Sequence, residues 1–446
     1  MNRPVRLLLI ALAMLACSAA FGTPARAHSG IQSYVYVSIT DSSVDGRVEF
    51  PAGDLGEAVG IDFPASAAAA EAVARANADA IRAYTADHLA MADGGGEWDL
   101  SFTDDLSILP VAGTHIVVPF TVENSFDGAP RDFRVEYDGI IHSNPERDAL
   151  FLIENDWGTA QFDNEADHLL GFSVGMTEQV IELEDVGTIE SMGAVRGLGT
   201  DVVREGIDHL LFVVALLLPV ALVALGSTVR GPAPSVAAAT RRASVLLGVF
   251  IAANSVVLWV LGLAGLEWPT DLVGSLVAGS LLVMAGYAVW RFTSRELLVV
   301  AVLGAVQGVG FAHAFVEGRL DRIDTPLALI AFNVGIEVGV VVIALLVFPV
   351  LLLLRRTALA AVALYGGAAM ISAYALAWLV ERVGGADLNV ERVANPFRVW
   401  PRNLWLMLLA WALAGALYAW TARRGALRTV AGSGTESSED RELVAS

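Results

Sequence analysis

An acid and an imidazole stand side by side at the start of a strongly apolar run, with Asp208 and His209 directly before Leu210 to Leu218. Ionisable groups at the centre of a transmembrane helix cost about 2.5 to 3.5 kcal/mol each on insertion scales. The cost is smaller near the membrane edge, but a pair there still indicates a path for an ion, a proton or a substrate. The first candidate for chemistry is therefore a polar site inside a membrane protein.

Five more polar side chains fall inside later apolar runs. Glu337 lies near the middle of one run, one helical turn after Asn333, so the two share a helix face. His313 lies near the end of the preceding run, which also holds Gln307, and Asn254 lies in an earlier run. A mid-membrane carboxylate is costly without a function, so we expect Glu337 to lie on a polar path from the outer edge. For Asn254 and Gln307 alone, ordinary hydrogen bonds between helices are the simpler interpretation.

Seven apolar segments come close to the ~20 residues that a helix needs to cross a bilayer. Two glycine pairs inside them, Gly304 with Gly308 and Gly335 with Gly339, have the small-xxx-small spacing that lets helices approach closely. We therefore predict a bundle of about seven transmembrane helices, at approximately residues 207–226, 243–264, 271–290, 297–316, 326–348, 357–380 and 403–421.

Arginines follow the odd-numbered spans, whereas the other loops are mixed or acidic. By the positive-inside rule, the arginine-rich loops are cytoplasmic. We therefore expect a multi-pass protein of the cell inner (plasma) membrane, with an extracytoplasmic N-terminal domain and a cytoplasmic C-terminus. The arginines concerned are Arg230, Arg241, Arg242, Arg291, Arg295, Arg355, Arg356, Arg423, Arg424 and Arg428.

The chain is acidic, and its charge is unevenly distributed. Its 446 residues carry a formal net charge of −20, and apolar residues make up 55% of them. Residues 28–200 hold 31 acidic residues against 7 arginines, whereas residues 201–446 hold 17 against 18. This pattern indicates an acidic, water-exposed domain before a nearly neutral membrane domain. Nucleic-acid binding is disfavoured because it needs a basic surface.

The first 27 residues have the layout of a secretory signal peptide. Arg3 and Arg6 precede the apolar run Leu7 to Ala16, and Ala25-Arg26-Ala27 is a small-x-small cleavage site. Cleavage after Ala27 removes Cys17, the single cysteine of the chain. The mature protein would then have neither a disulfide nor a thiolate metal site.

The same cleavage would make His28 the first residue of the mature protein. A free amino group and its own imidazole can chelate a cupric or nickel ion. His115, His142 and His168 are further candidate ligands, although their spacing matches no local metal motif. The outer site at His28 is accordingly a weak prediction.

Residues 28–200 lack any apolar run long enough to cross a membrane. Segments 34–39, 116–122, 133–137 and 149–153 are typical of strands, and the Ala-rich segment 65–91 is typical of a helix. We predict a β-rich, sandwich-like domain with one helical insertion. The predicted organisation is a signal peptide (1–27), an extracytoplasmic acidic β-rich domain (28–200), a seven-helix transmembrane domain (201–425) and a disordered cytoplasmic tail (426–446).

Three segments together resemble the HupE/UreJ family of bacterial membrane proteins, in particular its branch with an outer N-terminal domain. The family signature Gly-x-Asp-His-Leu-Leu-Phe is matched at residues 206–212. Its Gly-Phe-Ala segment is matched at 310–312, and its Phe-Asn-x-Gly-x-Glu-x-Gly segment at 332–339. The resemblance covers roughly residues 200–345. It implies a nickel or cobalt permease, or an accessory factor for hydrogenase and urease.

The chain departs from the family pattern at three positions. Val202, Asn254 and Gln307 stand where the family usually has histidine, and His313 is a partial replacement. Imidazole is a better nickel ligand than an amide, so the remaining carboxylates and amides would tolerate harder ions.

The leading hypothesis is a secondary permease for a divalent metal cation, nickel or cobalt by resemblance. The path would be lined by four principal residues and three supporting oxygen donors. No Gly-x-x-x-x-Gly-Lys-Ser motif is present, so we do not expect this chain to use ATP directly. We expect no cofactor besides the metal, which is the substrate. The principal residues are Asp208, His209, His313 and Glu337, and the supporting residues are Asn254, Gln307 and Asn333.

Two alternatives stay open. The first is a membrane-anchored extracytoplasmic binding or assembly protein without transport activity, in which the bundle is only an anchor. The second is an intramembrane metal-dependent hydrolase, with Asp208 and two membrane histidines around a metal-bound water. No separate nucleophile motif accompanies them, so we do not expect an enzyme. The expected partners are the lipid bilayer and a divalent metal ion, and the sequence leaves the ion, the transport direction and a homo-oligomeric state open.

Overall fold

The computed structural model describes residues 32–40, 42–109, 114–162, 169–224, 228–266, 268–290, 294–320, 325–384, 388, 390 and 402–430. The predicted signal peptide, His28 and His168 lie outside these residues, as does most of the predicted cytoplasmic tail. The chain forms two compact units that separate between Val195 and Arg196, with Gly318–Ala328 belonging to the first.

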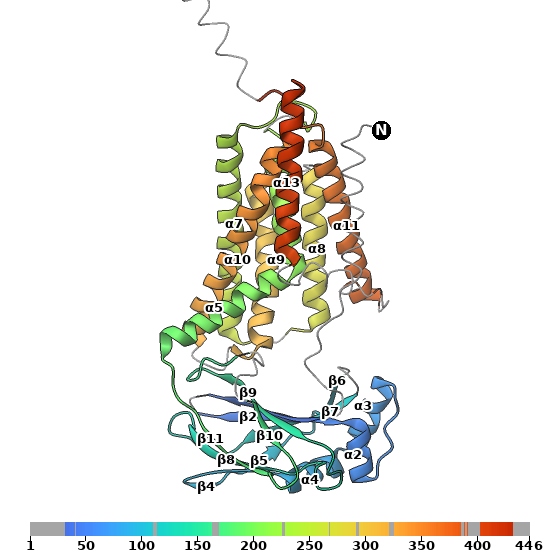
Figure 1. The fold of residues 1–446 in the computed structure, drawn as a ribbon, viewed down its shortest axis with the longest axis vertical. Helices are drawn as coiled ribbons and strands as arrows, with labels where there is room; N and C mark the ends of the chain where they lie inside the picture. Colours follow the sequence, from blue (N-terminus) through green and yellow to red (C-terminus); the bar gives the residue numbers. More distant parts are fainter. Residues whose placement is uncertain are drawn as a thin grey trace, which may run out of the picture. The chain divides into compact units, whose positions relative to one another are not determined.

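The first unit is built on two β-sheets (Figure 1). The larger sheet has the order β10-β9-β1-β2-β7-β5, and β6 also pairs with β7. Its strands are β1 (Ser33–Ile39), β2 (Val44–Pro51), β5 (Leu100–Phe102), β6 (Ser107–Leu109), β7 (His115–Val122), β9 (Ala149–Asp156) and β10 (Leu169–Phe172). The smaller sheet has the order β11-β8-β3-β4, from β11 (Glu178–Glu182), β8 (Asp132–Tyr137), β3 (Leu89–Asp93) and β4 (Gly96–Glu97).

Side-chain alternation turns one face of each sheet toward a shared apolar core. In β8, Phe133, Val135 and Tyr137 are buried, whereas the residues between them are exposed. Phe133 meets Phe151 of the larger sheet with ring centroids 6.4 Å apart. Each buried side chain of this size stabilises the fold by roughly 1.5–3 kcal/mol. The predicted β-rich, sandwich-like domain is therefore confirmed.

The helical insertion differs from the prediction, which placed one helix over residues 65–91. Two helices, α3 (Ala67–Ala76) and α4 (Ala78–His88), break at Asn77, whose side-chain amide donates to the Val73 carbonyl at 2.8 Å. This side chain competes with the helix ladder at the break. Residues 89–91 are strand and not helix, because they form the start of β3 and pair with β8. A short helix, α2 (Ala52–Val59), precedes them and packs against α4.

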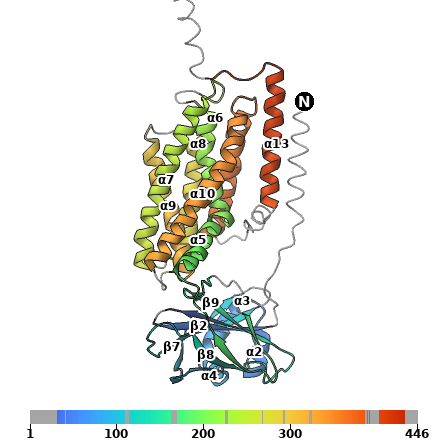
Figure 2. The same ribbon diagram turned by 60° about the vertical axis from the view of Figure 1, so that its left-hand side comes forward.

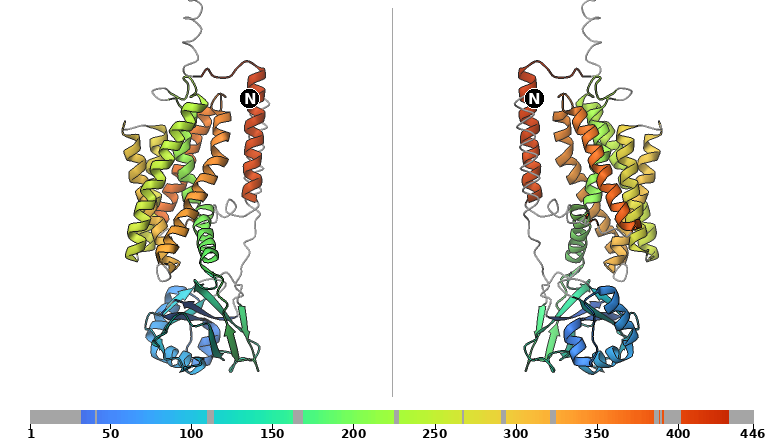
Figure 3. Two further views of the ribbon diagram at one scale, coloured as in Figure 1. Left: turned by 90° about the vertical axis from the view of Figure 1, so that its left-hand side faces the viewer. Right: turned by 90° about the vertical axis from the view of Figure 1, so that its right-hand side faces the viewer.

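The second unit is a bundle of long apolar helices (Figure 2). Among the described residues, six helices are long and apolar enough to cross a membrane. They are α7 (Val236–Ala264), α8 (Thr270–Val289), α9 (Glu296–Glu317), α10 (Thr325–Leu354), α11 (Ala360–Gly384) and α13 (Arg402–Arg423), with α13 at the edge of the bundle (Figure 3). The prediction of a β-rich region followed by about seven apolar helices is confirmed.

The first predicted span is half of a bent pair. Helix α6 (Ile207–Leu222) follows α5 (Thr188–Glu205) after a bend of 68°, and the two count as a span only together. Helix α5 was not predicted from the sequence, because its glycines lower helix propensity. One of them, Gly199, is needed for packing, because a methyl group there would overlap the Phe332 carbonyl oxygen of α10.

Candidate metal sites

The first polar cluster joins three helices around His209. Its imidazole is 7% exposed, and Nδ1 lies 2.7 Å from Oε1 of Gln307 on α9. The Gln307 amide donates in turn to Ser280 Oγ on α8 at 2.9 Å. Because the amide oxygen accepts, Nδ1 of His209 carries the proton and Nε2 keeps a free lone pair. Nε2 lies 3.5 Å from the Asp208 carboxylate, so an imidazole nitrogen and a carboxylate oxygen are available side by side.

Small residues make room for this imidazole. A methyl group on Gly206 would lie 2.6 Å from Cδ2 of His209, and one on Gly310 would lie 3.7 Å from its Cε1. Phe311 covers the ring with a centroid distance of 4.3 Å. Two of the three segments singled out in the sequence, 206–212 and 310–312, therefore pack together around one side chain.

The second polar cluster surrounds Glu337 of α10. Asn333 donates its amide to Glu337 Oε1 at 2.9 Å, and Ser255 of α7 donates to the same oxygen at 3.3 Å. Asn254, beside Ser255, is fully buried. In the described part of the chain, Asn254 Nδ2 and Asn333 Oδ1 have no hydrogen-bond partner. An unmet buried polar group costs about 1–3 kcal/mol. Asn333 Oδ1 is an acceptor and can bind a cation, whereas Asn254 Nδ2 is a donor.

Backbone contact between α7 and α9 brings the two clusters into neighbouring turns. A methyl group on Gly304 would lie 3.0 Å from the Phe250 carbonyl oxygen, and one on Gly308 would lie 2.6 Å from that of Asn254. The predicted close approach at this glycine pair is confirmed. Gly308, which contacts Asn254 of the second cluster, directly follows Gln307 of the first cluster in the sequence.

The other glycine pair also lies at a close helix contact. On α10, a methyl group on Gly335 would overlap the Arg196 carbonyl oxygen of α5, and one on Gly339 would lie 2.9 Å from Val203 Cβ. The Thr200 hydroxyl donates to the Gly335 carbonyl at 3.1 Å. Helix α5 is thus held against the turns of α10 that flank Glu337.

His313 belongs to neither cluster. Its Nε2 lies 3.6 Å from Glu317 Oε2 and, within the described residues, has no hydrogen-bond partner. The structure therefore pairs Asp208 with His209 but leaves His313 and Glu337 in separate surroundings. Across the described helices, no three His, Cys, Asp or Glu ligand atoms come within 4.8 Å of one another. The hydrolase alternative needs three such ligand atoms close together, and among the described residues those proposed for it do not form such a set.

One set of three does meet this distance, and it lies in the β-rich unit. His88, Asp138 and His142 place their ligand atoms within 4.8 Å of one another. Of these three residues, only His142 was predicted from the sequence as a candidate ligand; His88 and Asp138 were not. The spacing Asp138-x-x-x-His142 was a weak signal for part of the set. His88 lies 50 residues before Asp138, and only the pairing of β3 with β8 brings the two together.

The remaining histidine that the structure describes in the β-rich unit is part of its core. His115 on β7 is 3% exposed and lies 3.3 Å from the Gln32 carbonyl oxygen, beside the ring of Tyr34. Its surroundings are those of a packed side chain, and it does not belong to the set of three.

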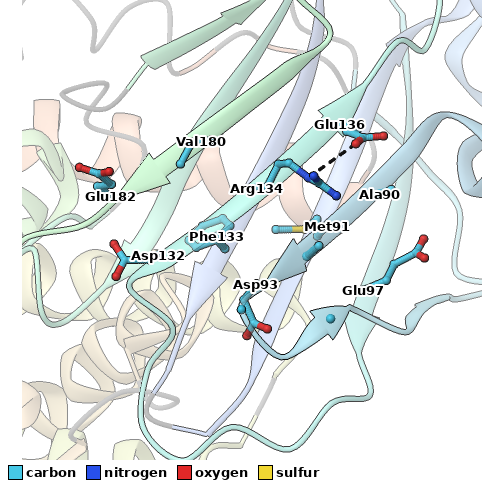
Figure 4. Close-up of a pocket in the computed structure, with 13 residues that line it drawn as sticks. Ala90, Met91, Asp93, Glu97, Asp132, Phe133, Arg134, Glu136, Val180 and Glu182 are labelled. Atoms are coloured by element: carbon cyan, nitrogen blue, oxygen red, sulfur yellow. Dashed lines mark ion pairs between the residues drawn. The ribbon is translucent and has the colours of Figure 1, made fainter.

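An acidic groove of about 510 Å³ lies on the smaller sheet (Figure 4). Arg134 in its centre pairs with Glu136 at 3.6 Å and with Glu178 at 3.5 Å. The other charged residues that line it are acidic, so the groove has a net negative charge: Asp93, Glu97, Asp132, Glu136 and Glu182.

Comparison with known proteins gives one match. Residues 177–382 match the family model described as HupE / UreJ protein. No curated protein and no solved structure matches this chain. The matched range contains the bent pair of helices, α7 to α10 and most of α11, and hence both polar clusters of the bundle.

Proposed function

The membrane region of this chain belongs to the HupE/UreJ family, and from this premise we propose that its helix bundle is a secondary permease for a divalent metal cation. The family relates the protein to nickel and cobalt. The long apolar helices make it a multi-pass membrane protein. Transport, the identity of the ion and the orientation in the membrane are parts of the proposal.

The proposal rests mainly on the incomplete hydrogen bonding of the polar side chains around Glu337. A carboxylate, a serine hydroxyl and two amides meet between α7 and α10, and Asn333 Oδ1 has no hydrogen-bond partner within the described residues. Most buried acceptors in folded proteins have a hydrogen-bond partner, so an unmet one favours a missing ligand. Carboxylate and amide oxygens are ligands suited to a cation, which would supply the missing partner of Asn333 Oδ1.

His209 and Asp208 provide a second point on the same path. Gln307 Oε1 accepts a hydrogen bond from Nδ1–H of His209, which leaves the lone pair of the neutral imidazole on Nε2, and the Asp208 carboxylate lies beside it. An imidazole fixed through its other nitrogen is the usual arrangement of a metal ligand. We propose that Asp208 and His209 receive the ion and that Glu337, Asn333 and Asn254 hold it deeper in the bundle.

The replaced histidines bear on which ion is carried. Gln307 uses its oxygen to orient His209 and its amide to bond Ser280, so neither atom is left for a metal. Asn254 can offer only an amide oxygen. With one imidazole in the first cluster and none in the second, we propose weaker nickel selectivity and tolerance of harder divalent ions such as Mn²⁺.

Transport by proteoliposomes tests the proposal. Purified protein is reconstituted with a metal-sensitive dye inside the vesicles, and Ni²⁺, Co²⁺ or Mn²⁺ is added outside. We expect Glu337→Gln to abolish uptake because it removes the charge while keeping the shape. The matched control is Glu381→Gln, a carboxylate of α11 outside both clusters, which should transport like the wild type.

Equal uptake by Glu337→Gln and the wild type would overturn the assignment of the path. Absence of uptake by a folded wild-type protein with all three ions would overturn the permease. That outcome would favour the alternative in which the bundle only anchors the outer domain.

A further inference from the structure

The β-rich unit holds a ligand set of its own, and we propose that His88, Asp138 and His142 bind one divalent transition-metal ion. The donor set of two imidazoles and a carboxylate suits zinc, nickel, cobalt or copper and not magnesium or calcium. This site goes beyond the proposed permease and does not depend on it.

Backbone pairing fixes two of the three ligands. His88 is the last residue of α4, and the chain then enters β3, where Leu89 pairs with Tyr137 of β8. Asp138 follows at the end of β8, and its N–H donates to the His88 carbonyl at 3.2 Å. The side chains meet on the same edge, with His88 Nδ1 2.6 Å from Asp138 Oδ1.

The third ligand is positioned by a strained turn. Ile140 has a φ of 66°, a left-handed conformation that costs a β-branched residue on the order of 1–3 kcal/mol. Its N–H donates to the Tyr84 hydroxyl at 2.8 Å, which holds the turn, and burial raises the pKa of Tyr84. The His142 N–H closes the turn on the Asp138 carbonyl at 3.0 Å. The strain places His142 over His88, with ring centroids 4.1 Å apart.

A metal would have to open the 2.6 Å contact between His88 Nδ1 and Asp138 Oδ1 and draw His142 in. Bonds of about 2.0–2.2 Å in tetrahedral geometry place ligand atoms about 3.4 Å apart. The ligand atoms lie within 4.8 Å of one another, and the exposed side chain of His142 can turn toward the other two. Three protein ligands leave a fourth position for water or another small molecule.

The surroundings concentrate cations at this point. A cleft of about 220 Å³ is lined by Asp87, His88, Glu136 and Asp138. It shares Ala90 and Glu136 with the acidic groove of Figure 4, so the two are neighbours on the smaller sheet. Clefts lined by one sign of charge raise the local concentration of counter-ions. If His88 and Asp138 formed only a surface hydrogen bond, neither the nearby His142 nor the acidic cleft would be needed.

The test uses the full-length protein in detergent and the metal alone. Calorimetric titration with Zn²⁺ and Ni²⁺ is carried out on Glu337→Gln, which removes the carboxylate of the deeper cluster in the bundle. We expect one equivalent to bind, and adding His142→Ala or Asp138→Asn to weaken it by about tenfold or more. Asp105→Asn, an exposed acid of the same unit, is the matched control and should bind like its parent. Visible absorption of the Co²⁺-loaded protein should show the strong bands of a four-coordinate site.

Two results would overturn the proposal. One is absence of metal binding in the Glu337→Gln protein, and the other is unchanged binding in both His142→Ala and Asp138→Asn. Failure of transport with this binding intact would count against the permease alone, so the two proposals fail separately. His142→Gln, which keeps a polar exposed side chain, serves if His142→Ala does not fold.

Discussion

Gly308 of α9 rests on the backbone of Asn254 in α7, so closely that a methyl group would lie 2.6 Å from the Asn254 carbonyl oxygen. This contact aligns the turn that carries Gln307 with the turn that carries Asn254 and Ser255. The relative placement of the two polar clusters of the bundle therefore depends on this backbone contact between α7 and α9.

We expect Gly308→Ala to destabilise the protein, because the added methyl group forces α7 and α9 apart. Overpacking of this kind typically costs about 1–3 kcal/mol. Thermal unfolding in detergent measures the change. The matched control is Gly248→Ala on α7, where a methyl group would meet nothing within 4 Å and should stabilise the helix slightly. Equal melting temperatures for the two variants would contradict the close contact between α7 and α9.

Replacing Gln307 should change ion selectivity. We expect Gln307→His to raise nickel uptake relative to manganese, because it adds an imidazole beside His209. Gln307→Ala should lower uptake of both ions, since it leaves His209 Nδ1 and Ser280 Oγ without their present partner. Competition between Ni²⁺ and Mn²⁺ in proteoliposomes measures the ratio. An unchanged ratio in Gln307→His would count against the placement of His209 on the path.

The hydrogen-bond lengths around Glu337 predict which of two further variants impairs uptake more. Asn333→Ala should impair uptake more than Ser255→Ala, because Asn333 donates at 2.9 Å and also offers the unmet Oδ1, whereas Ser255 donates at 3.3 Å. A hydrogen bond to a charged group contributes about 1.5–3 kcal/mol. Initial uptake rates at matched protein levels decide the order, and the reverse order would argue that Asn333 has no part in holding the ion.

Tyr84 should affect the outer metal site without binding the metal. Tyr84→Phe removes the acceptor of the Ile140 N–H and so loosens the strained turn that holds His142. We expect metal affinity to fall less than in His142→Ala, while the Co²⁺ spectrum keeps its shape because the donor atoms are the same. A changed spectrum would mean that Tyr84 is itself a ligand.

Metal removal should be visible in stability. A ligand at a hundred times its Kd stabilises a folded protein by about 2.7 kcal/mol. In the Glu337→Gln background, Zn²⁺ should therefore raise the melting temperature and EDTA should reverse the rise. The same additions should leave the His142→Ala protein unchanged, and an equal response there would locate the metal elsewhere.

Periodicity predicted the architecture well where one physical signal dominates. Long apolar runs marked the helices of the bundle, and alternation marked strands such as β8. Residues 89–91 were assigned to a helix because their composition continues the Ala-rich segment, whereas tertiary pairing with β8 makes them a strand. Helix α5 was missed because its glycines, which lower helix propensity, serve contact with α10.

The sites were harder to predict than the elements. The sequence singled out His209 and Gln307 but not their contact, which depends on how α6 and α9 are rotated. It placed His313 near the outer edge with Asp208 and His209, and Glu337 near the middle of the same path, whereas the structure gives His313 and Glu337 separate surroundings. His88 and Asp138 gave no local motif, because the strand ladder that unites them is a long-range feature.

The 68° bend at Gly206 gives the first span two attachments. Before the bend, α5 is clamped to α10 through Gly335 and Gly339, on either side of Glu337. After it, α6 is tied to α9 through the bond from His209 to Gln307. Gly206 therefore joins α5, which packs against the helix that carries Glu337, to α6, which carries the imidazole of His209. In the proposed permease, a change of this bend would shift the imidazole of α6 relative to the carboxylate of α10, which is a motion of the kind that alternating access needs.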